Sequence, residues 1–182
     1  MSALPESLRI ALALLAVTAA IWDIRTRSIP NWLVLAGLAA GVAGNVLLDG
    51  WRGAGSAFGG FGLALLLYLP LYLLRAAGGG DLKLAVAMGA IAGAVNWLVI
   101  FVLTAVLGGV FALLLVAVSG RLVRTVRNIA YILRQIARGR APYQGRPDLD
   151  VRSPESLRLP HGVAMALGAL GYLGASAMLA AR

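Results

Sequence analysis

Six long, predominantly apolar runs constrain the fold of this chain more than any other feature. A helix needs ~20 such residues to cross the hydrocarbon core of a bilayer, and most of the runs approach that length. They are Leu8–Trp22, Trp32–Leu48, Ala57–Leu74, Leu82–Val95, Trp97–Val118 and Val163–Ala181. Backbone groups inside a membrane must be hydrogen-bonded within the protein, which favours helices. The sequence therefore predicts an all-α, polytopic membrane protein with six transmembrane helices.

Composition supports this class and excludes several kinds of site. Of the 182 residues, 60% are hydrophobic and only 13% are charged, and we interpret residues 1–182 as one membrane-embedded domain. The chain has no cysteine and one histidine. Disulfides, thiolate metal sites and thiol nucleophiles are excluded, and so are a zinc site made of histidines and the usual histidine-based triads. We expect neither a cofactor nor a bound metal.

The basic residues are distributed unevenly between the two sides of the predicted bundle. Thirteen of the 16 follow the first, third or fifth apolar run, and the opposite side holds only Arg9, Arg52 and Arg182. Loops rich in lysine and arginine stay in the cytoplasm. This asymmetry predicts a multi-pass protein of the inner (cytoplasmic) membrane with both termini outside the cytoplasm. It also accounts for the net charge of +9 without a nucleic-acid partner.

Two connections between the runs have distinct patterns. Gly93, Asn96 and Trp97 are predicted to form the turn between the fourth and fifth runs, with Trp97 at a membrane interface. Arg121–Arg138 has basic and polar residues at steps of three and four. It predicts a basic amphipathic helix that lies on anionic lipid between the fifth and sixth membrane helices. With the proline-containing residues 139–160, it forms a cytoplasmic region over about 120–159.

Two aspartates are predicted to lie at the cytoplasmic side of the membrane. Asp23 ends the first run, and Asp81 begins the fourth run directly after three glycines. Asp23 would lie near a helix C-terminus, where the macrodipole disfavours an anion, whereas Asp81 alone could simply cap its helix. Two carboxylates within reach of each other share a proton. Such a pair can activate water and polarise a peptide carbonyl, which is the chemistry of aspartic peptidases.

The motifs around these aspartates resemble those of the type IV prepilin peptidases. Residues 23–31 read D-x-R-x-x-x-I-P-N, and residues 78–84 read G-x-G-D-x-K-L. Residues 159–164 are similar to a late P-aromatic-G segment, with His161 in place of the aromatic residue. The resemblance implies that Asp23 and Asp81 are the catalytic pair. The motif residues that would support them are Gly78, Gly80, Lys83, Arg25, Pro30, Asn31, Pro160 and Gly162.

The resemblance also implies an activity: a membrane aspartic endopeptidase that removes the short basic leader of prepilin-like proteins at the cytoplasmic face. The larger members carry a cysteine-containing N-terminal domain associated with N-methylation, and this sequence has no cysteine. The chain therefore resembles the short, peptidase-only kind associated with Flp-type (Tad) pili, and we expect no methyltransferase activity. The expected partners are prepilin-like substrates and anionic lipids, and the oligomeric state stays open.

Expectations for the supporting residues are less specific. Lys83 could act on the aspartates or extend to the lipid headgroups. Pro30 and Asn31 are expected to form a rigid start of the second helix, with Asn31 as its cap. His161 is expected to be a packed or interfacial imidazole without a catalytic role. The alternatives are a non-catalytic scaffold or small transporter, with the aspartates as a cap and a proton or cation site, and a preflagellin-type peptidase with other substrates.

Overall fold

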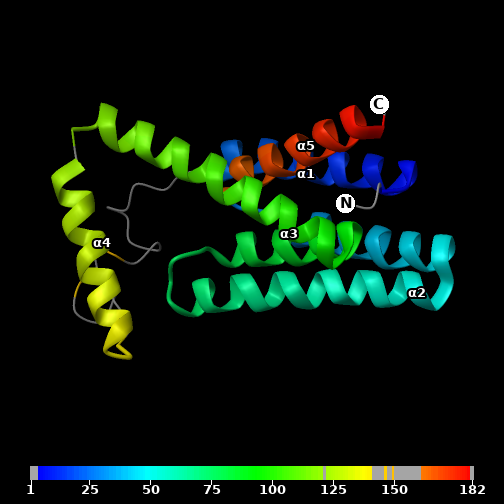
Figure 1. Ribbon diagram of the computed structural model, residues 1–182, viewed down its shortest axis with the longest axis horizontal. Coiled ribbons are helices and arrows are strands. Elements are labelled where there is room, and N and C mark those ends of the chain that lie inside the picture. Colours follow the sequence, from blue (N-terminus) through cyan, green and yellow to red (C-terminus); the bar gives the residue numbers. More distant parts are fainter. Residues whose placement is uncertain (1–3, 121, 141–145, 147–148, 150–160, 181–182) are drawn as a thin grey trace.

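The computed structural model describes residues 4–120, 122–140, 146, 149 and 161–180, and in this part the chain contains helices and no strands. The helices are α1 (Glu6–Thr26), α2 (Asn31–Leu73), α3 (Gly79–Val118), α4 (Leu122–Ala137) and α5 (His161–Ala180) (Figure 1). Four of them, α1, α2, α3 and α5, are long and apolar enough to cross a membrane. An all-helical, membrane-type fold is therefore confirmed.

Six separate membrane helices are not confirmed, because α2 and α3 each contain two of the predicted runs. A straight helix of the 43 residues of α2 would be ~65 Å long, about twice the hydrocarbon core. Instead, α2 turns back on itself (Figure 1), and its one non-helical residue is Gly50, with φ 55° and ψ −131°. Gly93 interrupts α3 in the same way, with φ 73°. One glycine in a conformation that other residues avoid thus replaces each expected loop.

The first part of α3 is the centre of the bundle. Every residue from Leu84 to Gly93 is buried, and α2 makes the most extensive contact with this helix. A Cβ atom on Gly60 of α2 would collide with the carbonyl oxygen of Gly89 of α3. The two backbones therefore approach each other directly, which fixes the start of α3 against the second arm of α2.

The predicted turn around Gly93 is correct only at that residue. Asn96 and Trp97 are helical and buried, so the Trp97 ring packs inside the bundle and is not exposed on its surface. Its side chain is 0% exposed, and its ring lies 6.2 Å from that of Tyr68, between centroids. The aromatic surface of Trp97 is covered by the bundle because the chain has already changed direction at Gly93.

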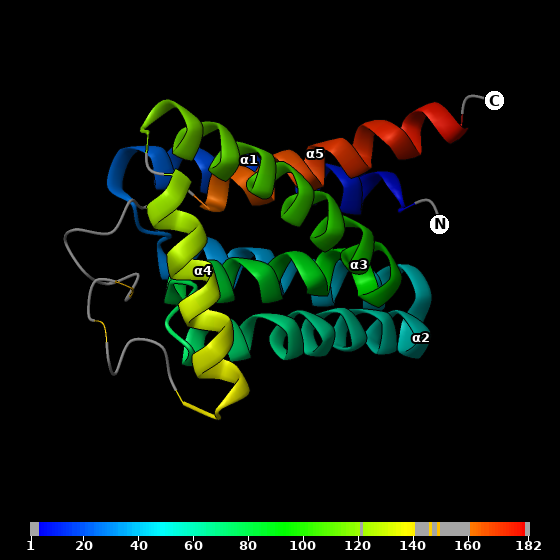
Figure 2. The same ribbon diagram turned by 60° about the vertical axis from the view of Figure 1, so that its left-hand side comes forward.

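Helices α1 and α5 pack together and bring distant parts of the sequence to one end of the molecule. The start of α1 and the end of α5 lie at the same end (Figures 1 and 2). The opposite end carries the end of α1, the connection from α2 to α3, and the start of α5. Asp23, Asp81 and Gly162 are therefore all at this second end.

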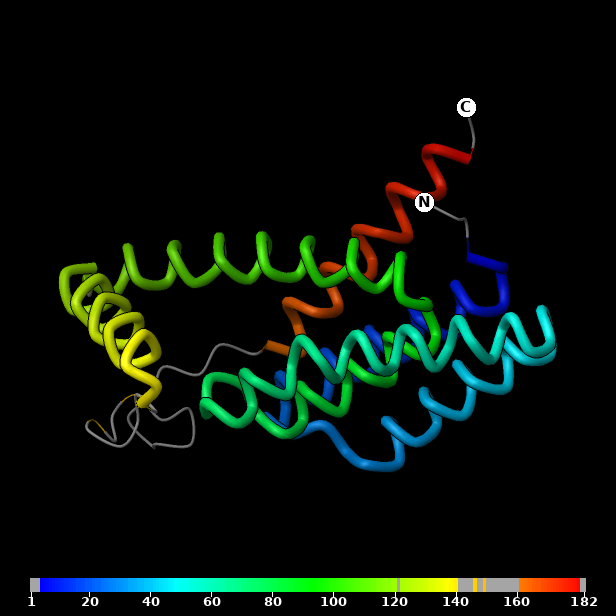
Figure 3. Tube along the Cα trace, turned by 60° about the horizontal axis from the view of Figure 1, so that its bottom comes forward, coloured from blue at the N-terminus to red at the C-terminus, as the bar shows by residue number. Residues whose placement is uncertain are grey.

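Helix α4 lies outside this bundle, at the far end of the long second arm of α3 (Figure 3). No residue of Leu122–Ala137, all of which the structure describes, is buried. The predicted amphipathic helix is confirmed from Leu122 to Ala137. Arg121 and most of residues 139–160 are outside the described residues, so the cytoplasmic loop stays a prediction.

Candidate active site

Asp23 is a buried carboxylate that binds the start of another helix. It lies in the last turn of α1 and is only 8% exposed. Its Oδ2 accepts a hydrogen bond of 2.8 Å from the backbone N–H of Gly162, 139 positions away, and the backbone of Val163 also hydrogen-bonds this side chain. The first amides of a helix have no partner within it. Asp23 therefore caps α5 from outside that helix.

This contact explains how an anion can lie at the end of α1. The C-terminal end of α1 disfavours a negative charge, whereas the N-terminal end of α5 favours one. Asp23 can approach the start of α5 this closely only because Gly162 has no side chain. A Cβ atom there would lie 2.8 Å from Oδ2 and 3.1 Å from Cβ of Asp23, so another residue would displace either the carboxylate or the helix.

Asp81 is held by its own segment of chain. It is the third residue of α3, and its Oδ2 accepts a hydrogen bond of 2.9 Å from the N–H of Gly78. The capping position itself is Gly78, so the simple reading of Asp81 as the capping residue is corrected. It is the acidic residue that reaches back to the helix start, as in half of a capping box.

The structure brings these two carboxylates close enough to interact electrostatically. His161, at the start of α5, also interacts with Asp23, and Tyr68 of α2 interacts with Asp81. Four helices thus contribute to one polar cluster at one end of an apolar bundle. Two carboxyl groups at one site are the arrangement that can supply both a base and an acid. The cluster can therefore offer a base for water and an acid for a carbonyl oxygen.

Lys83 and Asn31 join the two sequence motifs at the surface. The Lys83 Nζ donates a hydrogen bond of 2.9 Å to the Asn31 Oδ1, and both side chains are exposed. Asn31 does not cap α2, contrary to expectation, because it is already the first helical residue. The capping position is Pro30, with φ −69° and ψ 141° and no side-chain cap. The amide oxygen of Asn31 is instead used by the lysine.

The remaining motif residues have varied surroundings. A Cβ atom on Gly80 would lie 3.5 Å from Ile29, so the glycine motif packs against the I-P-N motif. Arg25 is exposed in the last turn of α1. Pro160 is outside the described residues. Among the residues that the structure describes, no group of three or more histidine, aspartate or glutamate side chains could hold a metal.

Tyr68 is a site residue that the sequence reasoning missed. It is 1% exposed, and its hydroxyl lies 3.3 Å from Nε2 of His161. This confirms the expectation that the His161 imidazole is packed. A buried tyrosine hydroxyl requires a polar partner, and a tyrosine within the apolar run 57–74 was the available signal. The contact fastens the start of α5, which carries Gly162, to α2.

The chain matches the type IV leader peptidase family over residues 10–113. It belongs to that family. The matched span is more than half of the chain and includes both aspartates and both motifs around them, which confirms the resemblance seen in the sequence. It ends before α5, so the amide that holds Asp23 lies outside it. No curated protein and no solved structure is significantly similar to the chain. Membership of this family indicates a peptidase.

Proposed function

We propose that this protein is a membrane aspartic endopeptidase that removes the leader of prepilin-like proteins, of the Flp/Tad type, at the cytoplasmic face. One observation carries the proposal. The buried carboxylate of Asp23 and the carboxylate of Asp81 lie at the same end of an apolar bundle, each held by the backbone amide of a glycine, in a chain of the type IV leader peptidase family. The proposed topology of six passes, with both termini outside the cytoplasm, places this end inside the cell.

The reaction needs only water and the two carboxyl groups. The ionised aspartate accepts a proton from water, and the protonated aspartate donates a hydrogen bond to the oxygen of the scissile carbonyl. The water oxygen attacks the carbonyl carbon to give a tetrahedral intermediate. A proton then passes to the leaving nitrogen and the C–N bond breaks. The products are the leader with a new carboxyl end and the mature protein with a free amino end.

The aspartate cluster and the basic helix α4 have opposite charge, so we expect them to bind different partners. A basic leader is attracted to the aspartates and repelled by the arginines of α4. We therefore assign α4 to the anionic headgroups of the inner leaflet, where each basic residue contributes about 1 kcal/mol. Membership of a peptidase family favours this reading over a scaffold or transporter. A preflagellin-type peptidase would use the same chemistry. The substrates that are cleaved in the assay distinguish it from a prepilin peptidase.

The test is leader cleavage of a co-expressed Flp-type prepilin by the wild type, Asp23→Asn and Asp81→Asn. Asparagine keeps an acceptor oxygen for the amides of Gly162 and Gly78 but cannot ionise, so it preserves a structural cap and removes the acid–base chemistry. We expect cleavage by the wild type only, with all three proteins equally abundant in the membrane. Full cleavage by either variant would show that the two-aspartate mechanism is wrong. Mass spectrometry of the product should show an unmethylated amino terminus.

A further inference from the structure

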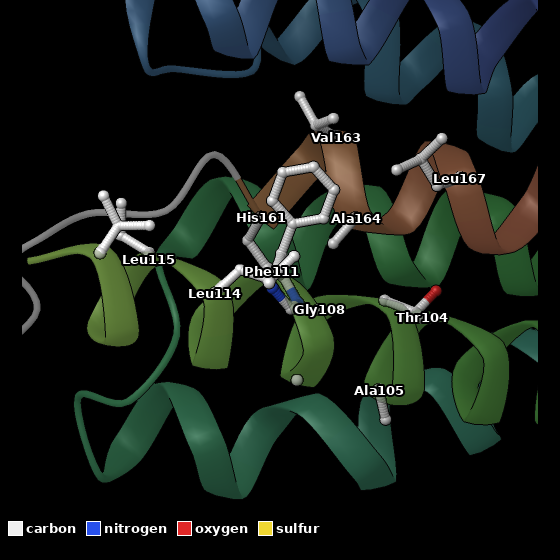
Figure 4. A pocket seen from close by; sticks show the side chains of 12 residues that line it. Thr104, Ala105, Gly108, Phe111, Leu114, Leu115, His161, Val163, Ala164 and Leu167 are labelled. Carbon is white, nitrogen blue, oxygen red and sulfur yellow. The ribbon is translucent and has the colours of Figure 1, made fainter. Parts of the chain in front are cut away.

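A groove of about 500 Å³ lies between the second arm of α3 and the first turns of α5 (Figure 4). Among the described residues its lining is almost entirely apolar, with Thr104 and His161 as the polar side chains. None of the described residues that line it is charged. Phe111, Leu114 and Leu115 face it from α3, and Val163, Ala164 and Leu167 from α5.

The groove is closed at one end, and its other end lies at the first residue of α5, next in sequence to the glycine that holds Asp23. At the closed end the helices touch, because a Cβ atom on Gly168 would collide with the hydroxyl of Thr104. In the middle, Gly108 has no side chain opposite Ala164, and an added Cβ would lie 3.5 Å from it. The other end is lined by His161. The next residue, Gly162, donates the hydrogen bond to Asp23.

Polarity therefore changes along this path in a definite order, from an uncharged apolar groove to a pair of carboxylates. A lipid with an anionic headgroup would place its charge beside like charges. A peptide with a basic segment followed by an apolar segment has the complementary order. The α3 wall runs from Thr104 to Val118, ~21 Å at 1.5 Å per residue, and the α5 wall from His161 to Leu167, ~9 Å. The part enclosed by both helices therefore matches about two turns of a helix.

We propose that this groove binds the apolar segment that follows the cleavage site of the substrate, as a helix packed between α3 and α5. The inference rests on the proposed function and adds where the substrate is held. The basic leader then extends past His161 to Asp23 and Asp81. Apolar burial in the groove supplies binding, and the polar end positions the scissile bond.

Site-specific photo-crosslinking tests the groove directly. Leu114, in the groove, is replaced by p-benzoylphenylalanine in one variant, and Leu66, an exposed leucine of α2 that does not line the groove, in another. The probe is a prepilin-like protein that the wild type cleaves in the same membranes. We expect a substrate adduct at position 114 and at least about tenfold less at position 66. Adducts with lipid alone at position 114, or equal substrate adducts at both positions, would overturn the inference.

A matched pair of substitutions distinguishes a blocked groove from a general effect of an added leucine on folding. Gly108→Leu fills the groove, whereas Gly62→Leu adds the same side chain at a position of α2 where a Cβ meets nothing within 4 Å. We expect Gly108→Leu alone to lower kcat/KM for the full-length substrate about tenfold, the scale of one lost apolar contact. Full cleavage by this variant would contradict the inference while leaving the proposed function intact. If the wild type cleaves no prepilin-like protein, the proposed function fails first, and this inference with it.

Discussion

Asp23 and Asp81 differ in how far along the sequence the amide lies that holds each carboxylate. Asp81 accepts a hydrogen bond from Gly78, three residues earlier and in the same segment. Asp23 accepts one from Gly162, 139 residues later and on another helix. The first arrangement forms whenever α3 begins at the glycines. The second forms only when α5 docks beside α1, so the geometry of Asp23 depends on the packing of the whole bundle.

The two sites also differ in how much space surrounds the amide donor. Gly78 has an extended conformation, with φ −75° and ψ 157°, and a Cβ atom there would come no closer than 3.2 Å to the Asp81 carboxylate. A Cβ atom on Gly162 would meet three atoms of Asp23 within 3.2 Å. The site of Asp23 and Gly162 therefore tolerates an added side chain less well than the site of Asp81 and Gly78.

The largest effect is expected from this matched pair of substitutions. Gly162→Ala should lower kcat/KM for leader cleavage about 100-fold, because the added methyl group displaces the Asp23 carboxylate. A displacement of about 1 Å near the reacting groups has an effect of this size. Gly78→Ala should stay within about threefold of the wild type, since a shift of a few tenths of an ångström accommodates it. Equal losses in both variants would contradict the difference between the two sites.

A smaller effect is expected at Tyr68, which fastens the start of α5. Tyr68→Phe removes the hydrogen bond to His161 and should lower kcat about tenfold or less, as the loss of one buried hydrogen bond implies. The KM for substrate should stay near that of the wild type, because Tyr68 does not line the groove. A change confined to KM, with kcat intact, would show that the contact does not act through the position of Asp23.

The link between Lys83 and Asn31 should matter less again. Both side chains are exposed, and Lys83→Met should lower the free energy of unfolding by about 1 kcal/mol or less. Asn31→Ala should have the same effect, and the double variant should be no worse than either single variant. Additive losses in a denaturation experiment, or a large loss of cleavage by Lys83→Met, would mean that the lysine has a further task.

The smallest effect on turnover is expected from α4, which lies outside the bundle and has no buried residue. Replacing Arg124, Arg134 and Arg138 by glutamine should weaken binding of α4 to vesicles that contain anionic lipid. Cleavage in membranes should be nearly unchanged. Vesicle binding can be measured with the isolated α4 sequence as a peptide, and cleavage with the full chain. An equal loss of cleavage in a normally folded protein would contradict the assignment of α4 to lipid.

The sequence predicted those features that depend on composition or on local pattern. Apolar runs predicted the membrane-type helices, the arginine spacing predicted α4, and the motifs indicated the two aspartates that the fold brings to one end of the bundle. Contacts between helices could not be predicted in the same way. Nothing near Asp23 in the sequence indicates that Gly162 holds it, and nothing near Tyr68 indicates His161. A change of direction was expected near Gly50 and at Gly93, but the sequence did not show that a single glycine would make each reversal without a loop, because a glycine in an apolar run is also compatible with a continuous helix.

The most direct test of the account is leader cleavage by purified protein in proteoliposomes, for the wild type, Asp23→Asn, Asp81→Asn and the double variant. Residues that act as one catalytic unit have strongly non-additive effects. We expect each single variant to lose essentially all cleavage and the double variant to be no slower than either. Substantial cleavage by one single variant, or losses that multiply in the double variant, would contradict a shared role of the two carboxylates.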